Sequence, residues 1–243
     1  MNWPLITRPL DRNAGPMTAE LTARDLAEPT APAEPAIDAQ PTGRRLARRL
    51  VQLYAGLVLY GLSSAMLVLA GFGLDPWDVF HQGLSRTIGL GIGTWSILIG
   101  AAVLLLWIPL RQRPGFGTLS NVVMIGGSLN VTLAVVPVPH LMAVRVVVLV
   151  AGVVLNGVAT GCYIGAGLGP GPRDGIMTGL AARGHYIRVV RTAIELTVLA
   201  IGFGLGGLVG IGTVVYALSI GPLAHVFIPI FKIRSSPRRA IRR

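Results

Sequence analysis

The sequence predicts an all-α integral membrane protein with about six transmembrane helices, arranged as two inverted-topology repeats of three helices each. Three observations support this fold class: little charge, six long apolar stretches and a duplicated motif. Of the 243 residues, 52% are hydrophobic and 13% are charged, whereas soluble domains average about 25% charged residues. Only four of the ten acidic residues lie beyond position 40. A soluble domain of this size would lack enough polar side chains to cover its surface.

The first 43 residues differ from the rest in composition. They are rich in Pro, Ala, Thr and acidic residues and have no apolar periodicity. Such a segment buries too little apolar surface to offset the entropy lost on ordering. We therefore predict a disordered cytoplasmic tail over residues 1–43, a transmembrane domain over 44–231 and a basic cytoplasmic tail over 232–243.

The transmembrane domain contains six apolar stretches. A helix needs about 20 apolar residues to cross about 30 Å of hydrocarbon at about 1.5 Å per residue. The stretches that meet this requirement are Leu50–Phe72, Gly93–Leu110, Phe116–Val136, Val146–Gly167, Val189–Gly206 and Leu208–Phe231. The last two must be separate helices joined at the glycine-rich segment 202–210, because forty residues are too many for one span.

Basic residues predict the orientation of these spans. With the N-terminus in the cytoplasm, sixteen Lys and Arg residues of the transmembrane domain and C-terminal tail lie on the cytoplasmic side, and only Arg86 and Arg145 lie outside. The positive-inside rule therefore places both termini in the cytoplasm. Because the arginines cluster beside apolar spans, the net charge of +11 reflects membrane topology, and nucleic acid is excluded as a partner.

The chain carries an internal repeat. When Arg49 is aligned with Arg145, the alignment continues without a gap to Ser85 and Ala181. A second block aligns the segment from Gly115 with that from Gly210. The first repeat covers about residues 49–136 and the second about 145–231. Each holds three spans, and three is odd, so the second repeat must enter the membrane from the opposite face. Inverted repeats are typical of many transporters.

The duplicated motif reads GFGLDPWDVFHQGLS at Gly71–Ser85 and GLGPGPRDGIMTGLA at Gly167–Ala181. In each copy a proline followed two residues later by an aspartate predicts a helix start, because proline suits the first helical position and a carboxylate there favours the helix dipole. The motifs are either well-capped surface loops or short helices that line a cavity. The candidate cavity residues are Pro76, Asp78, Pro172, Arg173 and Asp174.

A further pair of charged residues lies within an apolar stretch. Arg191 and Glu195 are four residues apart, so they lie on one helix face. An ionised group at the centre of a membrane helix costs about 2.5–3.5 kcal/mol. Glu195 is therefore near the helix end, paired, protonated or facing a cavity. The pair is either interfacial or linked to a proton or ligand.

Other motifs indicate packing rather than chemistry. Gly157, Gly161 and Gly165 follow the small-xxx-small pattern that permits close helix contact. The four histidines show no metal-ligand spacing, and we expect them at the membrane interface. We predict no catalytic residues, no metal site and no cofactor.

The duplicated motif, together with RVVRTAIELTVLAIGFGLGG and GIGTVVYALSIGPLAH, resembles the bacterial YczE-like membrane proteins of the YczE/YyaS/YitT grouping. The resemblance covers Arg49 to about Phe231. It implies a multi-pass protein of the bacterial inner membrane and brings no substrate or reaction with it.

Two functions fit these observations best, and a lipid- or peptide-modifying enzyme comes third because the sequence shows no recognisable nucleophile or metal set. The first is a small-solute transporter or permease, whose site lies between the repeats. The alternative is a non-transporting membrane scaffold or accessory partner protein, for which apolar surfaces and polar termini suffice. Neither is an enzyme. The expected partners are the lipid bilayer and a small solute, and the chain is either monomeric or a homo-oligomer.

Overall fold

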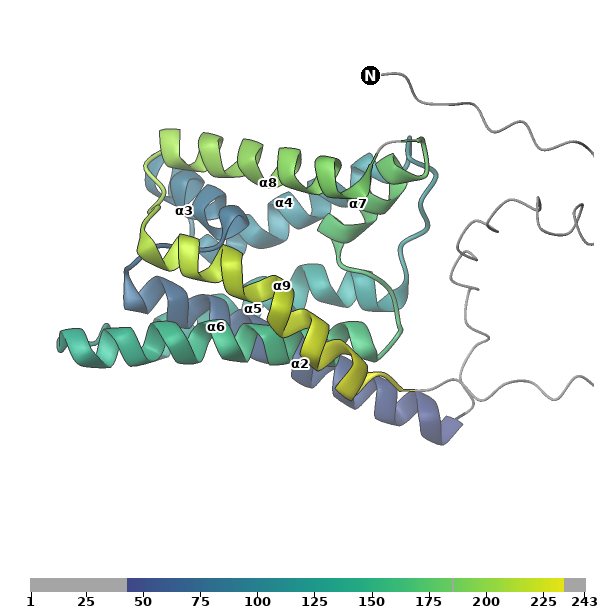
Figure 1. The fold of residues 1–243 in the computed structure, drawn as a ribbon, viewed down its shortest axis with the longest axis horizontal. Helices are drawn as coiled ribbons and strands as arrows, with labels where there is room; N and C mark the ends of the chain where they lie inside the picture. Colours follow the sequence, from purple (N-terminus) through teal and green to yellow (C-terminus); the bar gives the residue numbers. More distant parts are fainter. Residues whose placement is uncertain (1–42, 185, 234–243) are drawn as a thin grey trace, which may run out of the picture. The chain divides into compact units, whose positions relative to one another are not determined.

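The computed structural model describes residues 43–184 and 186–233, and in these ranges the chain is all-helical, without strands. The predicted tails lie outside the described residues, apart from Gly43, Lys232 and Ile233. The described helices (Figure 1) are α2 (Gly43–Ala70), α3 (Pro76–Ile88), α4 (Ile92–Leu106), α5 (Phe116–Val135), α6 (Met142–Gly165), α7 (Pro172–Ala181), α8 (Ile187–Gly204) and α9 (Ile211–Phe231).

The prediction of an all-α membrane protein is confirmed, with fewer clear spans than the six predicted. By length and composition, α2, α5, α6 and α9 can each cross a membrane. Helices α3 and α4 meet at 113° and add a fifth crossing if the bent pair is one span. Helix α4 alone has only 15 residues. Helix α8 has 18 residues, among them Arg188, Arg191 and Glu195, so charge interrupts its apolar surface.

Helices α2 and α6 form the centre of the packing and run antiparallel. A Cβ added at Gly56 would lie 2.8 Å from the Cβ of Cys162, and one added at Gly152 would lie 3.1 Å from the Cβ of Met66. Small residues thus let the two backbones approach closely. In the proposed alignment Gly56 corresponds to Gly152, so the two halves use the same position for this contact.

The glycine pattern of α6 makes the close helix contact that its spacing predicts, and the partner helix is α9. A Cβ at Gly157, Gly161 or Gly165 would lie within 2.7 Å of an atom of α9; at Gly161 the nearest atom is the Cβ of Phe227. Helix α2 packs on α5 in the same way, because a Cβ at Gly61 would overlap α5. Each long helix therefore packs on the last helix of its own half.

The breaks after α2 and α6 have matching backbones. Gly71 has a φ of 68° and Gly167 a φ of 65°, while Gly73 and Gly169 have φ values of 116° and 133°. Positive φ is costly for residues with a side chain. The repeated glycines of the motif are thus explained by conformation, since both turns require this backbone.

The halves also contact each other reciprocally. The amide of Gly212 donates to the carbonyl of Phe72 at 2.8 Å, and the amide of Gly117 donates to the carbonyl of Leu168 at 2.9 Å. Phe72 aligns with Leu168, and Gly212 with Gly117. Each half therefore docks the break after its first helix onto the last helix of the other half.

Helices α5 and α9 begin with the same local bond. The Oγ1 of Thr118 accepts from the amide of Gly115 at 3.3 Å, and the Oγ1 of Thr213 accepts from the amide of Gly210, also at 3.3 Å. Thr118 donates in turn to the carbonyl of Pro170 at 2.7 Å. This bond fixes the start of α5 against the loop that precedes α7.

Candidate functional site

Both copies of the motif start a helix at the predicted proline, Pro76 in α3 and Pro172 in α7. The residue before Pro76 is the N-cap: the Oδ1 of Asp75 accepts from the amides of Trp77 and Asp78 at 3.0 and 3.2 Å. The corresponding residue before Pro172 is Gly171, which has no side chain to cap the helix. Sequence reasoning missed Asp75, although an aspartate directly before a first-turn proline is itself a cap signal.

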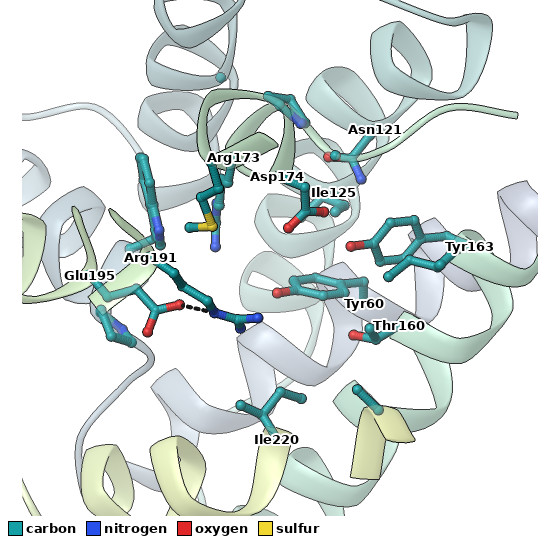
Figure 2. Close-up of a pocket in the computed structure, with 18 of the residues that line it drawn as sticks. Tyr60, Asn121, Ile125, Thr160, Tyr163, Arg173, Asp174, Arg191, Glu195 and Ile220 are labelled. Carbon is teal, nitrogen blue, oxygen red and sulfur yellow. Dashed lines mark hydrogen bonds and ion pairs between the residues drawn. The ribbon is translucent and has the colours of Figure 1, made fainter. Parts of the chain in front are cut away.

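A cavity of about 490 Å³ lies among the helices, and all eight described helices contribute to its wall. Its charged and polar side chains point inward from several sides (Figure 2). The structure brings six of the seven predicted residues to this cavity: Pro76, Pro172, Arg173, Asp174, Arg191 and Glu195. The repeated motif therefore lines a shared cavity, in addition to starting two helices.

Asp78, the seventh predicted residue, lies behind the cavity wall. It is 3% exposed, and its Oδ1 lies 3.1 Å from the Nδ1 of His81, one helical turn further on. His81 lines the cavity and is 1% exposed. This histidine is therefore buried inside the protein, at the wall of the cavity. The D-x-x-H spacing was a signal for it, because residues three apart share a helix face.

Arg191 and Glu195 form the ion pair that their spacing predicts. The Nε of Arg191 lies 3.0 Å from the Oε1 of Glu195, and Figure 2 shows the guanidinium directed toward the middle of the cavity. The ion pair and the cavity-facing position together explain how the carboxylate of Glu195 is tolerated in an apolar helix.

Arg173 bridges the two halves of the chain. Its Nη1 lies 3.6 Å from the Oδ1 of Asp75, and its guanidinium carbon lies 4.9 Å from the centre of the Trp77 ring. Arg173 is the aligned counterpart of Trp77, so equivalent residues of the two motifs contact each other. Asp174 follows Arg173 directly in the sequence but is not its ion-pair partner. Within the described residues, Asp174 has no ion-pair partner, because Arg173 extends to the other motif instead.

Tyrosines that sequence reasoning did not select complete the polar wall. Figure 2 shows the Asp174 carboxylate directed toward the side of the cavity occupied by Tyr60 and Tyr163, whose ring centres are 6.0 Å apart. The hydroxyl of Tyr216 donates to Asn156 at 3.0 Å. Single tyrosines inside apolar spans gave no motif by which to find them.

The remaining wall is apolar and comes from α4, α5 and α9, including Ile99, Val103, Ile125 and Ile220. The cavity thus presents arginines, carboxylates and hydroxyls together with aliphatic groups. Across 43–184 and 186–233, no group of three or more His, Cys, Asp and Glu residues is placed to hold a metal ion. The arrangement suits a small solute with a charged group and an apolar part.

The fold and this cavity define a class of protein: a multi-helix membrane protein with a cavity lined by charged residues among its helices. The chain belongs to the family described as "Family of unknown function (DUF6198)", which matches residues 47–229. This match and the relatives named below together confirm the resemblance to YczE-like membrane proteins.

Three relatives place the chain more closely. It is 40% identical over 179 residues to an uncharacterized protein of Haemophilus influenzae, covering 73% of this chain and 82% of that protein. It is 33% identical over 189 residues to the uncharacterized membrane protein YczE of Bacillus subtilis, covering 76% and 88%. YyaS of Bacillus subtilis, also uncharacterized, is 29% identical over 182 residues, covering 72% and 90%. No solved structure matches the chain.

Proposed function

We propose that this protein is a small-solute permease of the bacterial inner membrane, with its binding site in the cavity. The observation that carries the proposal is that one cavity is lined by charged side chains from separate elements, Arg173 from α7 and Arg191 and Glu195 from α8. Charged residues inside membrane segments are costly and usually functional. The proposal involves no covalent chemistry, so the protein is not an enzyme.

The proposal includes an inverted repeat with both termini in the cytoplasm. The matching glycine conformations and the reciprocal contacts between halves support such a repeat, and the distribution of arginines supports the orientation. In many transporters the solute site lies where two such repeats meet. The contact of Arg173 with its counterpart Trp77 fits that location. A C-terminal reporter fusion that is active only in the periplasm would contradict this orientation.

The test begins with an unbiased search for the solute. Metabolite contents of cells with and without the gene are compared, and each compound that differs is offered in labelled form to purified protein in liposomes. We expect protein-dependent flux of at least one compound. The proposal is wrong if every such compound enters protein-containing and empty liposomes at the same rate.

A matched pair of variants on α9 connects flux to the cavity. Ile220→Trp places a large ring in the cavity, which Ile220 lines (Figure 2). Leu218→Trp makes the same change at a position that is 73% exposed. We expect the first to block flux and the second to retain it. Equal flux in both variants would place the pathway elsewhere.

A further inference from the structure

Three titratable side chains at the start of α3 form a buried cluster beside the cavity. Asp75, Asp78 and His81 are 1%, 3% and 1% exposed. Asp78 contacts His81 at 3.1 Å, and Asp75 lies 3.6 Å from Arg173. The aligned residues of the second motif are Gly171, Asp174 and Met177, so only the first motif carries the complete cluster.

The charges of this cluster do not balance. With both carboxylates ionised and the imidazole neutral, Asp75 and Asp78 carry two negative charges, and Arg173 supplies one positive charge. Burying an uncompensated charge in protein is strongly unfavourable. One added proton on a carboxylate or on the imidazole restores neutrality.

The cluster also has atoms that can accept this proton. Among the described residues, Asp75 Oδ2, Asp78 Oδ2 and His81 Nε2 are buried and have no hydrogen-bond partner. Buried polar atoms normally have partners. A proton requires only one such acceptor, whereas a metal ion requires several ligands.

Among the described residues, no Arg or Lys other than Arg173 is in ion-pair contact with the cluster, although α9 also contributes His225 and α7 contributes Asp174 to the cavity wall. Helix α2 contributes Tyr60 and α9 contributes Tyr216 to the cavity wall, and neither side chain can carry a positive charge. Helix α8 packs on α3, and its cavity-facing Arg191 is paired with Glu195. Helix α4 has no titratable residue.

We propose that the Asp75–Asp78–His81 cluster binds a proton and that its protonation releases Arg173 to bind an anionic solute in the cavity. This inference rests on the proposed function and specifies its coupling ion and solute class. When unprotonated, the cluster holds Arg173 electrostatically. When protonated, it attracts Arg173 less, and the guanidinium, whose side chain is 26% exposed, becomes available to the solute. The proton comes from water and returns to water.

The cavity defines the solute as an organic carboxylate with an apolar part. Arginine binds carboxylates through two parallel hydrogen bonds, and the isoleucine and valine side chains that also line the cavity suit an apolar group. Because linkage is reciprocal, the anion also increases proton binding by the same factor. The two would therefore move together through the membrane.

Benzoate is a suitable probe, because its charge is constant over the range used and its ring is apolar. Its binding to purified full-length protein in detergent is measured by calorimetry between about pH 6 and about pH 8. We expect the affinity of the wild type to increase by up to about tenfold for each unit of decreasing pH.

Two variants separate proton binding by the cluster from anion binding by Arg173. Asp75→Asn keeps the helix cap, since asparagine caps about as well as aspartate, and removes the charge that holds Arg173. It should bind benzoate at high pH as the wild type does at low pH. Arg173→Gln should lose benzoate binding while the infrared band of a protonated carboxyl group persists, which shows that the cluster still folds and binds protons.

The proposal is overturned if the wild type binds no benzoate or binds it with the same affinity at both pH values. It is also overturned if Asp75→Asn keeps the wild-type pH dependence, or if Arg173→Gln binds benzoate normally. If binding is proton-linked in detergent and no compound moves across liposomes, the proton-linked site stands and the permease proposal falls.

Discussion

The contact between α6 and α9 makes a quantitative prediction at Gly161. A Cβ at this position would lie 2.7 Å from the Cβ of Phe227, 2.8 Å from its carbonyl carbon and 2.9 Å from its carbonyl oxygen. Two of these are backbone atoms, so no side-chain rotation relieves the overlap. Gly161→Ala must therefore move α6 away from α9, and the flanking contacts at Gly157 and Gly165 open with it.

The expected magnitude follows from two opposing effects. Overpacking a helix contact costs about 1–3 kcal/mol, while replacing glycine by alanine inside a helix gains about 1 kcal/mol. Gly161→Ala should thus lose up to about 2 kcal/mol, and Gly161→Leu should lose more. At about 2–4 °C per kcal/mol for a chain of this size, the midpoint of thermal unfolding in detergent should fall by several degrees.

Gly127 in α5 is the matched control, because a Cβ there would meet nothing within 4 Å. Gly127→Ala retains the stabilisation that comes from the higher helix propensity of alanine and adds no steric overlap. Its unfolding midpoint should therefore equal or exceed that of the wild type. The packing argument is refuted if Gly161→Ala is as stable as Gly127→Ala.

Three further predictions concern buried polar groups. Tyr216→Phe leaves the Oδ1 of the fully buried Asn156 without its donor and should cost about 1–3 kcal/mol in unfolding free energy; an unchanged denaturation midpoint would contradict this. Thr213→Val removes the bond at the start of α9 and should cost about 1 kcal/mol, whereas Thr213→Ser should retain stability. Asp78→Asn should reduce flux more than Asp174→Asn, when flux is normalised to the amount of protein in the membrane. The reason is that Asp78 is buried against a histidine, whereas within the described chain Asp174 lacks an ion-pair partner. The opposite order would count against a role for the cluster.

The elements of the fold could be predicted because their signals are local. Each predicted span overlaps one described helix, with starts that differ by a few residues except at α2, which begins at Gly43 rather than Leu50. Pro76 and Pro172 begin their helices as predicted, since proline suits the first helical turn. The number of crossings was less predictable, because α4 is short and bent against α3, a geometry that hydropathy does not encode.

The site was predicted in part. Pairing of Arg191 with Glu195 followed from helix geometry alone. The partner of Arg173 did not, because Asp75 is distant in the sequence and neighbouring Asp174 offered a nearer carboxylate. Asp75 and His81 could have been predicted from local signals. Asp75 stands at a helix-cap position, and His81 completes a D-x-x-H spacing. Tyr60 and Tyr163 carried none.

By itself the sequence determined the membrane class, the approximate bounds of the helices, the repeat and the glycines at the two breaks. These depend on composition and on interactions between residues close in the chain. Only the tertiary structure decided that both motifs face one cavity and that Arg173 contacts Asp75 and Trp77 of the other half. It also showed that Asp78 lies behind the wall while His81 lines it. Such contacts depend on how α2 and α6 pack through their glycines, and that packing sets which side chains of distant segments meet.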